Sequence, residues 1–215
     1  MTIFVKNVKA TNLFGMYNIS WNFNHSVSII IGPNGCGKST ALKIIDDTVN
    51  GINSKFPADS VSVETASDNI KTFDLCLVPN LAECLKRVEH CADQINMFTT
   101  MINEMFEVTK KHIEPKDLGF VVMQKDKELN QAWLSPSEMY FISLFFNLIF
   151  KAENCLVLID NLGDGLHVNW QEVLIDNIND IAEIRGLQVI VVSHSISTIA
   201  DHTDQIAEMN IKVIE

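Results

Sequence analysis

The stretch Gly32-Pro33-Asn34-Gly35-Cys36-Gly37-Lys38-Ser39-Thr40 decides the fold. It matches the pattern G-x-x-x-x-G-K-[ST] without exception. The preceding residues 27–32 are β-branched and continuous, as in a fully buried strand, and an apolar-periodic helix is predicted from about Lys38 to Val49. A glycine-rich turn that matched by chance would lack these flanks, so we interpret the stretch as a loop that binds phosphate.

The residue types of this loop are those that a triphosphate requires. Glycines let successive backbone N–H groups turn inward around an anion, and the following helix adds its N-terminal dipole. Lys38 offers a point charge to the β- and γ-phosphates, and Ser39 offers a hydroxyl group to Mg²⁺.

Taken as a whole, the loop resembles the Walker A motif of ABC-type ATPases and of the related heads of SMC and DNA-repair proteins. The resemblance implies ATP and Mg²⁺ as cofactors. The nucleotide-binding residues that it implies in this loop are Asn34, Gly35, Cys36, Gly37, Lys38, Ser39 and Thr40.

The segment Cys155–Ile159 is predicted to be a buried strand and ends in Asp160, as in the Walker B motif of that family. The resemblance implies that Asp160 and Ser39 hold Mg²⁺. Asn161 stands where the family has its catalytic glutamate. An amide cannot act as a general base at neutral pH, although it can orient a water molecule. Slow hydrolysis, or none, therefore stays open.

The segment Val191-Val192-Ser193-His194-Ser195 resembles the family's switch segment, in which the histidine reaches the γ-phosphate and holds the attacking water. Asp160 and His194 are 34 residues apart, which allows one helix between two parallel strands. The implied catalytic residues are Lys38, Asp160, Asn161 and His194.

Between these motifs, Leu134-Ser135-Pro136-Ser137-Glu138 resembles the L-S-G-G-Q or L-S-x-G-E signature, in which Ser135 and Ser137 would contact the γ-phosphate held by a second copy. The second glycine is replaced by Ser137. The same residues also predict a capping box with proline at the first helical position. Both interpretations can hold, because a capped helix N-terminus is itself an anion site.

Two further segments bear on the resemblance. Leu162-Gly163-Asp164-Gly165-Leu166-His167 resembles the stretch that follows Walker B in OLD-like bacterial ATPases, and it aligns with the D-loop, which contacts the other subunit. A Q-loop glutamine is not evident; Gln124 follows a strand but is expected in a different hairpin. Phe14, Tyr17 and Trp21 are candidates for adenine stacking or for the core.

The alternation of strands and helices predicts an α/β P-loop NTPase fold, with a mainly parallel sheet, flanking helices, an antiparallel strand region and a small helical lobe. We expect one domain over 1–215, with a nucleotide-binding lobe (1–79 and 145–215) and a helical, signature-bearing lobe at about 80–144. Further predicted segments are strands at 2–9, 73–78, 120–123 and 187–192, one long helix or two abutting helices at 81–105, helices from 135 onward and at 169–184, and a terminal hairpin at 206–214.

Charge and hydropathy exclude several classes of protein. Residues 128–215 carry 3 basic and 13 acidic side chains, so this half is not expected to bind nucleic acid directly. The longest apolar run, Met139–Phe150, is too short to span a bilayer, and no membrane insertion is expected. Five cysteines without a C-x-x-C pair fit reduced thiols in a cytoplasmic protein.

Three functions fit these observations. The leading hypothesis is a non-transporter ABC-type ATPase that forms a homodimer around ATP·Mg²⁺ and signals to a separate effector or partner protein, in phage defence or DNA repair. The interval between Lys38 and Ser135 is too short for the coiled-coil arms of SMC proteins. The alternatives are an ATP-binding switch with little or no hydrolysis, motivated by Asn161, and the nucleotide-binding subunit of a transporter.

Overall fold

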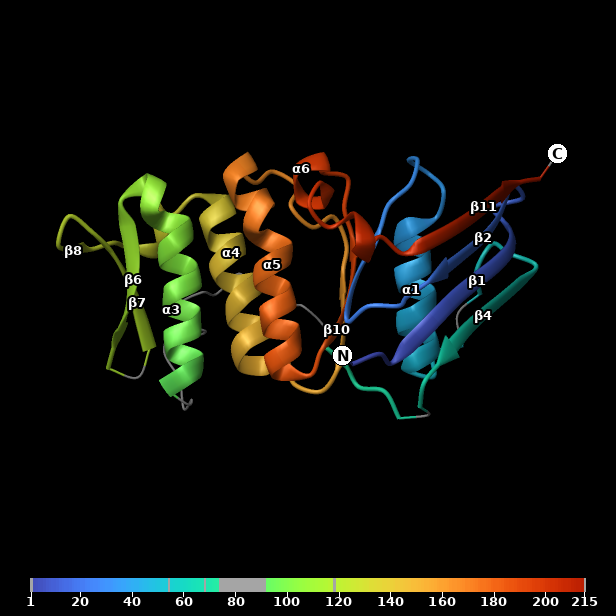
Figure 1. Ribbon diagram of the computed structural model, residues 1–215, viewed down its shortest axis with the longest axis horizontal. Coiled ribbons are helices and arrows are strands. Elements are labelled where there is room, and N and C mark those ends of the chain that lie inside the picture. The colour runs from blue at the N-terminus through green and yellow to red at the C-terminus, as the bar shows by residue number, and fades with distance from the viewer. Residues whose placement is uncertain (1, 54, 68, 74–91, 118, 215) are drawn as a thin grey trace. The chain divides into compact units, whose positions relative to one another are not determined.

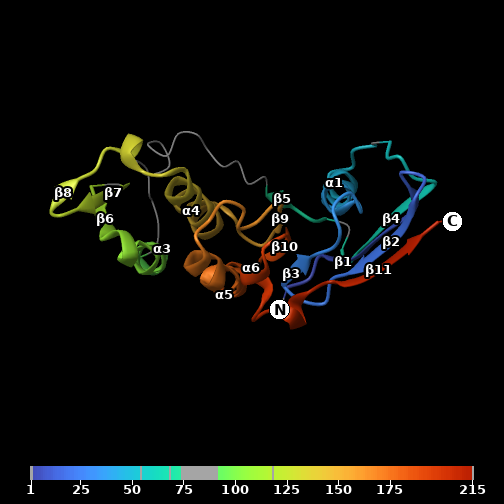
Figure 2. The same ribbon diagram turned by 90° about the horizontal axis from the view of Figure 1, so that it is seen from above.

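The computed structural model describes residues 2–53, 55–67, 69–73, 92–117 and 119–214. The chain forms two compact units, and their helices and strands are labelled in Figures 1 and 2. The first unit comprises Met1–Asp74 and Glu153–Glu215, and the second comprises Leu75–Ala152. The assignment of a nucleotide-binding lobe (1–79 and 145–215) and a helical lobe (about 80–144) stays a prediction.

A parallel sheet forms the centre of the first unit. Its strand order is β3 (Val27–Ile30), β10 (Gln188–Val192), β9 (Leu156–Ile159) and β5 (Thr72–Phe73). Every residue of β3 and β10 is buried, which explains their continuous β-branched sequence. Helix α5 (Val168–Arg185) connects β9 to β10, as the 34-residue interval predicted.

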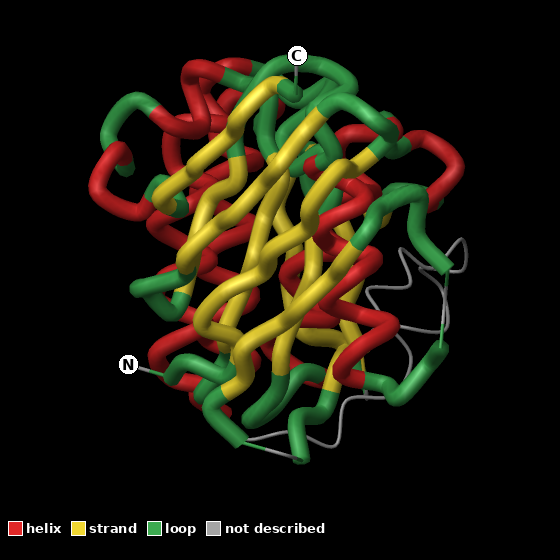
Figure 3. The backbone as a smooth tube through the Cα atoms, turned by 90° about the vertical axis from the view of Figure 1, so that its right-hand side faces the viewer, coloured by secondary structure: helices red, strands yellow, loops and turns green. Residues whose placement is uncertain are grey.

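An antiparallel sheet forms the other layer of this unit, and Figure 3 shows the yellow strands running side by side. Its order is β11 (Glu208–Val213), β2 (Tyr17–Asn22), β1 (Val5–Leu13) and β4 (Ser60–Thr65). The predicted hairpin at 206–214 is wrong. This segment forms one strand, because β2 offers it a partner from the beginning of the chain.

Helix α1 (Lys38–Val49) lies between the two sheets, as Figure 2 shows. Its apolar face joins a core cluster that takes residues from both sheets, including Trp21, Ile44 and Ile190. Trp21 is fully buried and belongs to this core rather than to a ligand site. The chain continues after β10 through the short helix α6 (Ile196–Ile199) and the 3₁₀ turn η4 (Thr203–Gln205).

One buried side chain bonds the two layers to each other. The Oε1 atom of Gln188, at the start of β10, accepts hydrogen bonds from the backbone N–H groups of Phe4 and Val5, each at 2.7 Å. Its Nε2 atom donates to the carbonyl oxygen of Val5 at 2.8 Å. Since Gln188 is fully buried, water cannot replace these bonds.

The second unit contains α3 (Ala92–Phe106), α4 (Pro136–Phe146) and a three-stranded antiparallel sheet of β6 (Lys111–Lys116), β7 (Gly119–Gln124) and β8 (Lys127–Glu128). Short helical turns lie at η1 (Glu107–Thr109), η2 (Gln131–Trp133) and η3 (Asn147–Lys151). The predicted helix at 81–105 is described only from Ala92, and residues 74–78 of the predicted strand at 73–78 lie outside the described residues.

Packed aromatic rings form the core of the second unit. Phe98 lies edge-on to Phe120, Phe146 and Phe150, with ring centroids 4.9 to 5.9 Å apart. These rings join α3, β7, α4 and η3. Within the described part of the chain, no helix combines the length and the apolar character that crossing a membrane requires.

We predict that Gln188→Leu lowers the free energy of unfolding by about 3 kcal/mol, because it leaves two backbone N–H groups and one carbonyl group buried without partners. Urea unfolding followed by circular dichroism measures the change. The control is Gln205→Leu, since Gln205 is half-buried and its bond to Asn179 is long, at 3.4 Å. Equal stability of the two variants would contradict the role assigned to Gln188.

Candidate nucleotide-binding site

The three central strands end at the same edge of the parallel sheet. In the register of the sheet, Val192 of β10 lies opposite Ile30 of β3, and Val191 lies opposite Ile159 of β9. One more hydrogen bond joins β3 and the residue after β10: the N–H of Ser193 donates to the carbonyl oxygen of Ile30 at 3.3 Å. The three loops that carry the predicted motifs therefore meet at one place.

Gly37 fixes how the loop after β3 enters helix α1. Its φ angle is +96°, in the left-handed region. A Cβ atom at this position would lie only 2.6 Å from the Cδ2 atom of Leu13. Any side chain here would both strain the backbone and collide with the core, so the glycine at this position of the motif has a structural reason.

Lys38 points back into the loop. Its side chain is buried, with the residue only 6% exposed, and its Nζ atom donates to the carbonyl oxygens of Gly32 and Pro33, each at 2.9 Å. The N-terminus of α1 has no side-chain cap and no acidic residue in its first turn. Positive charge and backbone N–H groups thus converge here, as binding of an anion requires.

A pocket of about 320 Å³ lies over this loop. It is lined by Phe14, Asn34, Gly35, Gly37, Lys38, Ser39, Thr40 and His194. Residues from the loop after β3 and from the loop after β10 therefore share one cavity, although 156 positions separate Lys38 from His194. His194 is exposed, so its imidazole ring is accessible to a molecule in the pocket.

Three predicted residues of the same unit do not line this pocket. The side chain of Cys36 is buried in the core cluster as a free thiol, so it does not reach the pocket. Asp160 and Asn161 are exposed and follow β9 at the neighbouring position of the sheet edge. Phe14 lines the pocket and is 40% exposed, whereas sequence alone did not separate it from Tyr17 and Trp21.

The predicted metal-coordinating oxygen atoms of the protein are compatible with a Mg²⁺ ion that also takes oxygens from water and phosphate. Among the described residues, no group of three or more His, Cys, Asp or Glu side chains is arranged to hold a metal ion. Ser39 and Asp160 are both exposed oxygen donors, and the described residues place no basic side chain within ion-pair distance of Asp160. Mg²⁺ typically takes one or two protein oxygens, several waters and phosphate oxygens, which matches this set.

Asn161 adopts a left-handed backbone conformation, with φ at +56°. Its N–H donates to the Oδ1 atom of Asp160 at 3.1 Å, and the turn allows the N–H of Leu162 to donate to the carbonyl oxygen of Val192 at 2.8 Å. Asparagine tolerates this conformation better than most residues. Residue 161 is thus constrained by backbone geometry as well as by chemistry.

The signature segment lies in the second unit, at the start of α4. The capping box is confirmed: the Oγ atom of Ser135 accepts from the N–H of Glu138 at 3.2 Å, and the Oε2 atom of Glu138 accepts from the N–H of Ser135 at 2.8 Å. Ser135 is exposed and Ser137 is half-buried. Their predicted contact with a phosphate held by another copy stays a prediction.

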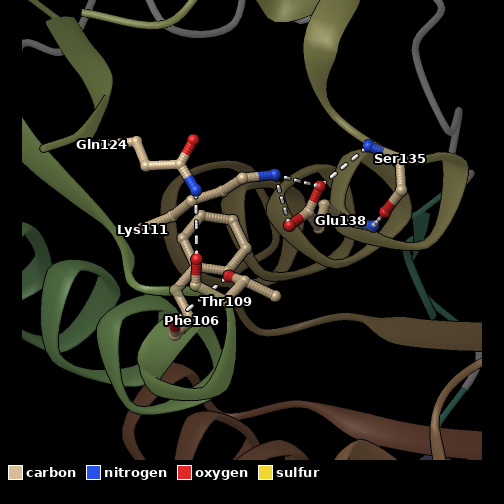
Figure 4. A network of polar contacts seen from close by, with 6 residues as sticks. All are labelled: Phe106, Thr109, Lys111, Gln124, Ser135 and Glu138. Carbon is tan, nitrogen blue, oxygen red and sulfur yellow. Dashed lines mark hydrogen bonds and ion pairs between the residues drawn. The ribbon is translucent and has the colours of Figure 1, made fainter. Parts of the chain in front are cut away.

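Glu138 also joins α4 to the β6–β7 hairpin (Figure 4). Its two carboxylate oxygens accept from the Nζ atom of Lys111 at 2.8 and 2.9 Å. Burial would raise the pKa of Glu138, but the hydrogen bonds from Lys111 and Ser135 outweigh it and hold the pKa below the usual range of a glutamate. The carboxylate therefore stays ionised inside the unit.

Gln124 belongs to the same hairpin and bonds within the second unit. Its Nε2 atom donates to the carbonyl oxygen of Thr109 at 3.1 Å, as Figure 4 shows. It closes the connection between α3 and β6 and so has a local structural role.

Residues 85–200, just over half of the chain, match the family described as "AAA domain, putative AbiEii toxin, Type IV TA system". The chain belongs to this family of P-loop ATPases. The matched range includes the signature segment, Asp160 and His194, and the phosphate loop precedes it.

Curated relatives of this ABC-type ATPase include two zinc import ATP-binding proteins named ZnuC. The protein from Wolbachia sp. subsp. Brugia malayi is 25% identical over 182 residues, which cover 84% of this chain and 67% of the relative. The protein from Buchnera aphidicola subsp. Acyrthosiphon pisum is 28% identical over 187 residues, which cover 87% of this chain and 70% of the relative.

Solved structures support the P-loop NTPase fold. The SMC head domain from Thermotoga maritima superimposes with a TM-score of 0.59 at 14% identity, covering 99% of this ATPase and 100% of that chain. An SMC head bound to the C-terminal winged-helix domain of ScpA gives a TM-score of 0.55 at 11% identity, covering 99% and 98% of the two chains. At these identities the likeness concerns the fold alone.

We predict that Glu138→Gln lowers the free energy of unfolding by about 3 kcal/mol at pH 7, because it leaves the Lys111 ammonium group inside without a counter-charge. The folded-state pKa of Glu138 is depressed, so this stabilisation is present above the pKa of an unfolded glutamate, about 4.3, and is lost as the pH falls through the lower folded value. Urea unfolding at several pH values should show the two proteins converging in acid.

The matched control is Glu128→Gln. Glu128 pairs with Lys116 in the same sheet at 2.6 Å, but both side chains are about half exposed. Removing an exposed pair should cost less than about 1 kcal/mol. A difference between wild type and Glu138→Gln that stayed constant from pH 7 to pH 3 would contradict the ion-pair account.

Proposed function

We propose that this ABC-type ATPase hydrolyses ATP as a homodimer and that a separate effector or partner protein reads its ATP-bound state. The pocket carries this proposal, because it brings Lys38, Ser39 and His194 together. In it, Lys38 binds the β- and γ-phosphates, and His194 orients the water that attacks the γ-phosphate in line. When bound through Ser39 and Asp160, Mg²⁺ would neutralise charge on the phosphates.

The dimer is proposed to complete each site. The N-terminus of α4 in one copy, with Ser135 and Ser137, would contact the γ-phosphate bound by the loop of the other copy. The exposure of Ser135 and the capped, ordered helix start support this arrangement. The D-loop, with Asp164 and His167 exposed, would face the partner copy.

The biological role is proposed as phage defence or DNA repair in the cytoplasm. The family description, which names a toxin of a type IV TA system, supports the defence side of this proposal. Residues 128–215 carry a net charge of −10, so we propose that this half contacts a basic partner protein and not nucleic acid.

Two other functions are each supported by one observation. Asn161 in place of a glutamate supports an ATP-binding switch with little turnover, since its amide cannot accept a proton. The ZnuC relatives, which are named for zinc import, support a transporter subunit. Purification of the native complex separates this last function from the others, because it predicts an integral-membrane partner.

We predict that Lys38→Ala weakens ATP binding at least tenfold, because it removes the charge that faces the phosphates. Lys43→Ala is the matched control: Lys43 lies on the same helix, is exposed, and pairs with Asp47 at 3.6 Å. Calorimetry measures binding, and light scattering measures mass. ATP should double the mass of wild type and Lys43→Ala only; ATP binding without this change would overturn the dimer.

We predict that Asn161→Glu raises the rate of phosphate release at least tenfold, because a carboxylate can accept the proton of the attacking water. The gain is reduced by roughly 1 kcal/mol of backbone strain at the left-handed position. Asn161→Ala, which carries neither amide nor carboxylate, is the control. Rapid turnover of wild type that Asn161→Glu fails to increase would refute both this prediction and the non-hydrolysing switch.

A further inference from the structure

We propose that Gln171 is a positioning residue that couples the D-loop to the loop that carries His194. We define the D-loop as residues 162–167 and the switch loop as residues 193–195. The amide of Gln171 bonds to both loops at once. This inference rests on the proposed role of His194 at the γ-phosphate.

On one side, Gln171 holds the D-loop. The residue lies in the first turns of α5, where its N–H donates to the carbonyl oxygen of His167 at 3.1 Å. The Nε2 atom of its side chain donates to the carbonyl oxygens of Gly163 and Leu166, at 2.9 and 3.0 Å. Both amide hydrogens are therefore used, and they tie the two ends of the glycine-rich turn to the helix.

On the other side, the same amide holds the switch loop. The Oγ atom of Ser195 donates to the Oε1 atom of Gln171 at 2.5 Å. Ser195 also caps helix α6, since its Oγ atom accepts from the N–H of Thr198 at 3.4 Å. Because the hydroxyl proton goes to Gln171, the lone pairs of Ser195 remain free for the cap.

A second serine, Ser193, precedes His194 and also bonds to the D-loop. The Oγ atom of Ser193 is buried, donates to the carbonyl oxygen of Leu162 at 3.0 Å and accepts from the N–H of Ser195 at 3.2 Å. The residues on both sides of His194 are thus linked to the D-loop. Ser193 bonds to it directly, and Ser195 is linked to it through Gln171.

His194 needs such support. Its ring lines the pocket and is exposed, and among the described residues no hydrogen bond holds the imidazole itself. The backbone of the switch loop therefore sets where the ring lies. A Cβ atom on Gly163 would lie 2.9 Å from the Oγ1 atom of Thr198, so the D-loop also packs directly on α6. A shift of the D-loop is expected to move the switch loop with it.

The alternative is that Gln171 only stabilises its own turn, and hydrogen–deuterium exchange separates this local role from coupling. Hydrogen–deuterium exchange of the full-length protein without nucleotide is followed in peptides from both loops. Ser195→Ala should raise exchange in residues 162–167 several-fold, although Ser195 reaches that loop only through Gln171 and Ser193. Gln171→Leu should raise exchange in both loops.

The matched control is Asn179→Leu, which removes an amide two turns further along α5. The Nδ2 atom of Asn179 donates to the Oε1 atom of Gln205 at 3.4 Å, which is a long hydrogen bond. This variant should leave both loops unchanged. If Ser195→Ala raises exchange only in residues 193–199, the coupling is refuted.

Turnover gives a second, independent readout. Gln171→Leu should lower kcat about tenfold and leave KM for ATP within twofold, since the phosphate loop is untouched. The double variant Gln171→Leu/Ser195→Ala should lose no more than Gln171→Leu, because both changes break one path; additive losses would overturn the proposal. If wild type neither binds nor hydrolyses ATP, the proposed function fails, whereas the exchange result still decides the coupling.

Discussion

The register of three parallel strands is the constraint on which the candidate site depends. The strands β3, β10 and β9 are hydrogen-bonded neighbours and end together, so the chain leaves the sheet three times at one edge. Because β3 and β10 are wholly buried, their alignment is specified by packing on both faces, and Gln188 further bonds β10 to the antiparallel layer. A loose sheet would separate Lys38 from His194.

The site exists at a cost in stability. Lys38 is a charged group with little exposure, and α1 begins at Gly37 without a side-chain cap for its first N–H groups. The uncapped N–H groups of α1 and the third hydrogen of the Lys38 ammonium group are the donors that an anion would meet. By contrast, α4 begins with a complete capping box and a buried ion pair, which make its start rigid. The start of α1 thus lacks a side-chain cap, whereas the start of α4 is held by one.

The features that depend on local sequence patterns could be predicted from the sequence. The features that depend on contacts between distant segments could not. The phosphate loop, the strands around Asp160 and His194 and the capping box at Ser135 follow from motif and periodicity, and the structure has them in these positions. The pairing of β11 with β2 joins segments far apart in the sequence, and no local sequence pattern predicts it. The hydrogen bonds of Gln171 likewise depend on how α5 packs. In the sequence, Gln171 therefore could not be distinguished from other polar residues on a helix surface.

The backbone at residue 161 offers a physical reason why this chain lacks the expected glutamate. The left-handed turn there directs Leu162 back to β10 and begins the D-loop that Gln171 holds. Asparagine favours that turn, and a glutamate would be strained in it. Under the proposed function the ATP-bound state is the signal, and a D-loop held by Gln171 together with an amide that cannot act as a base would lengthen the time for which a partner can read that state. Under the same proposal, these two loops would set the rate of turnover more than the phosphate loop does.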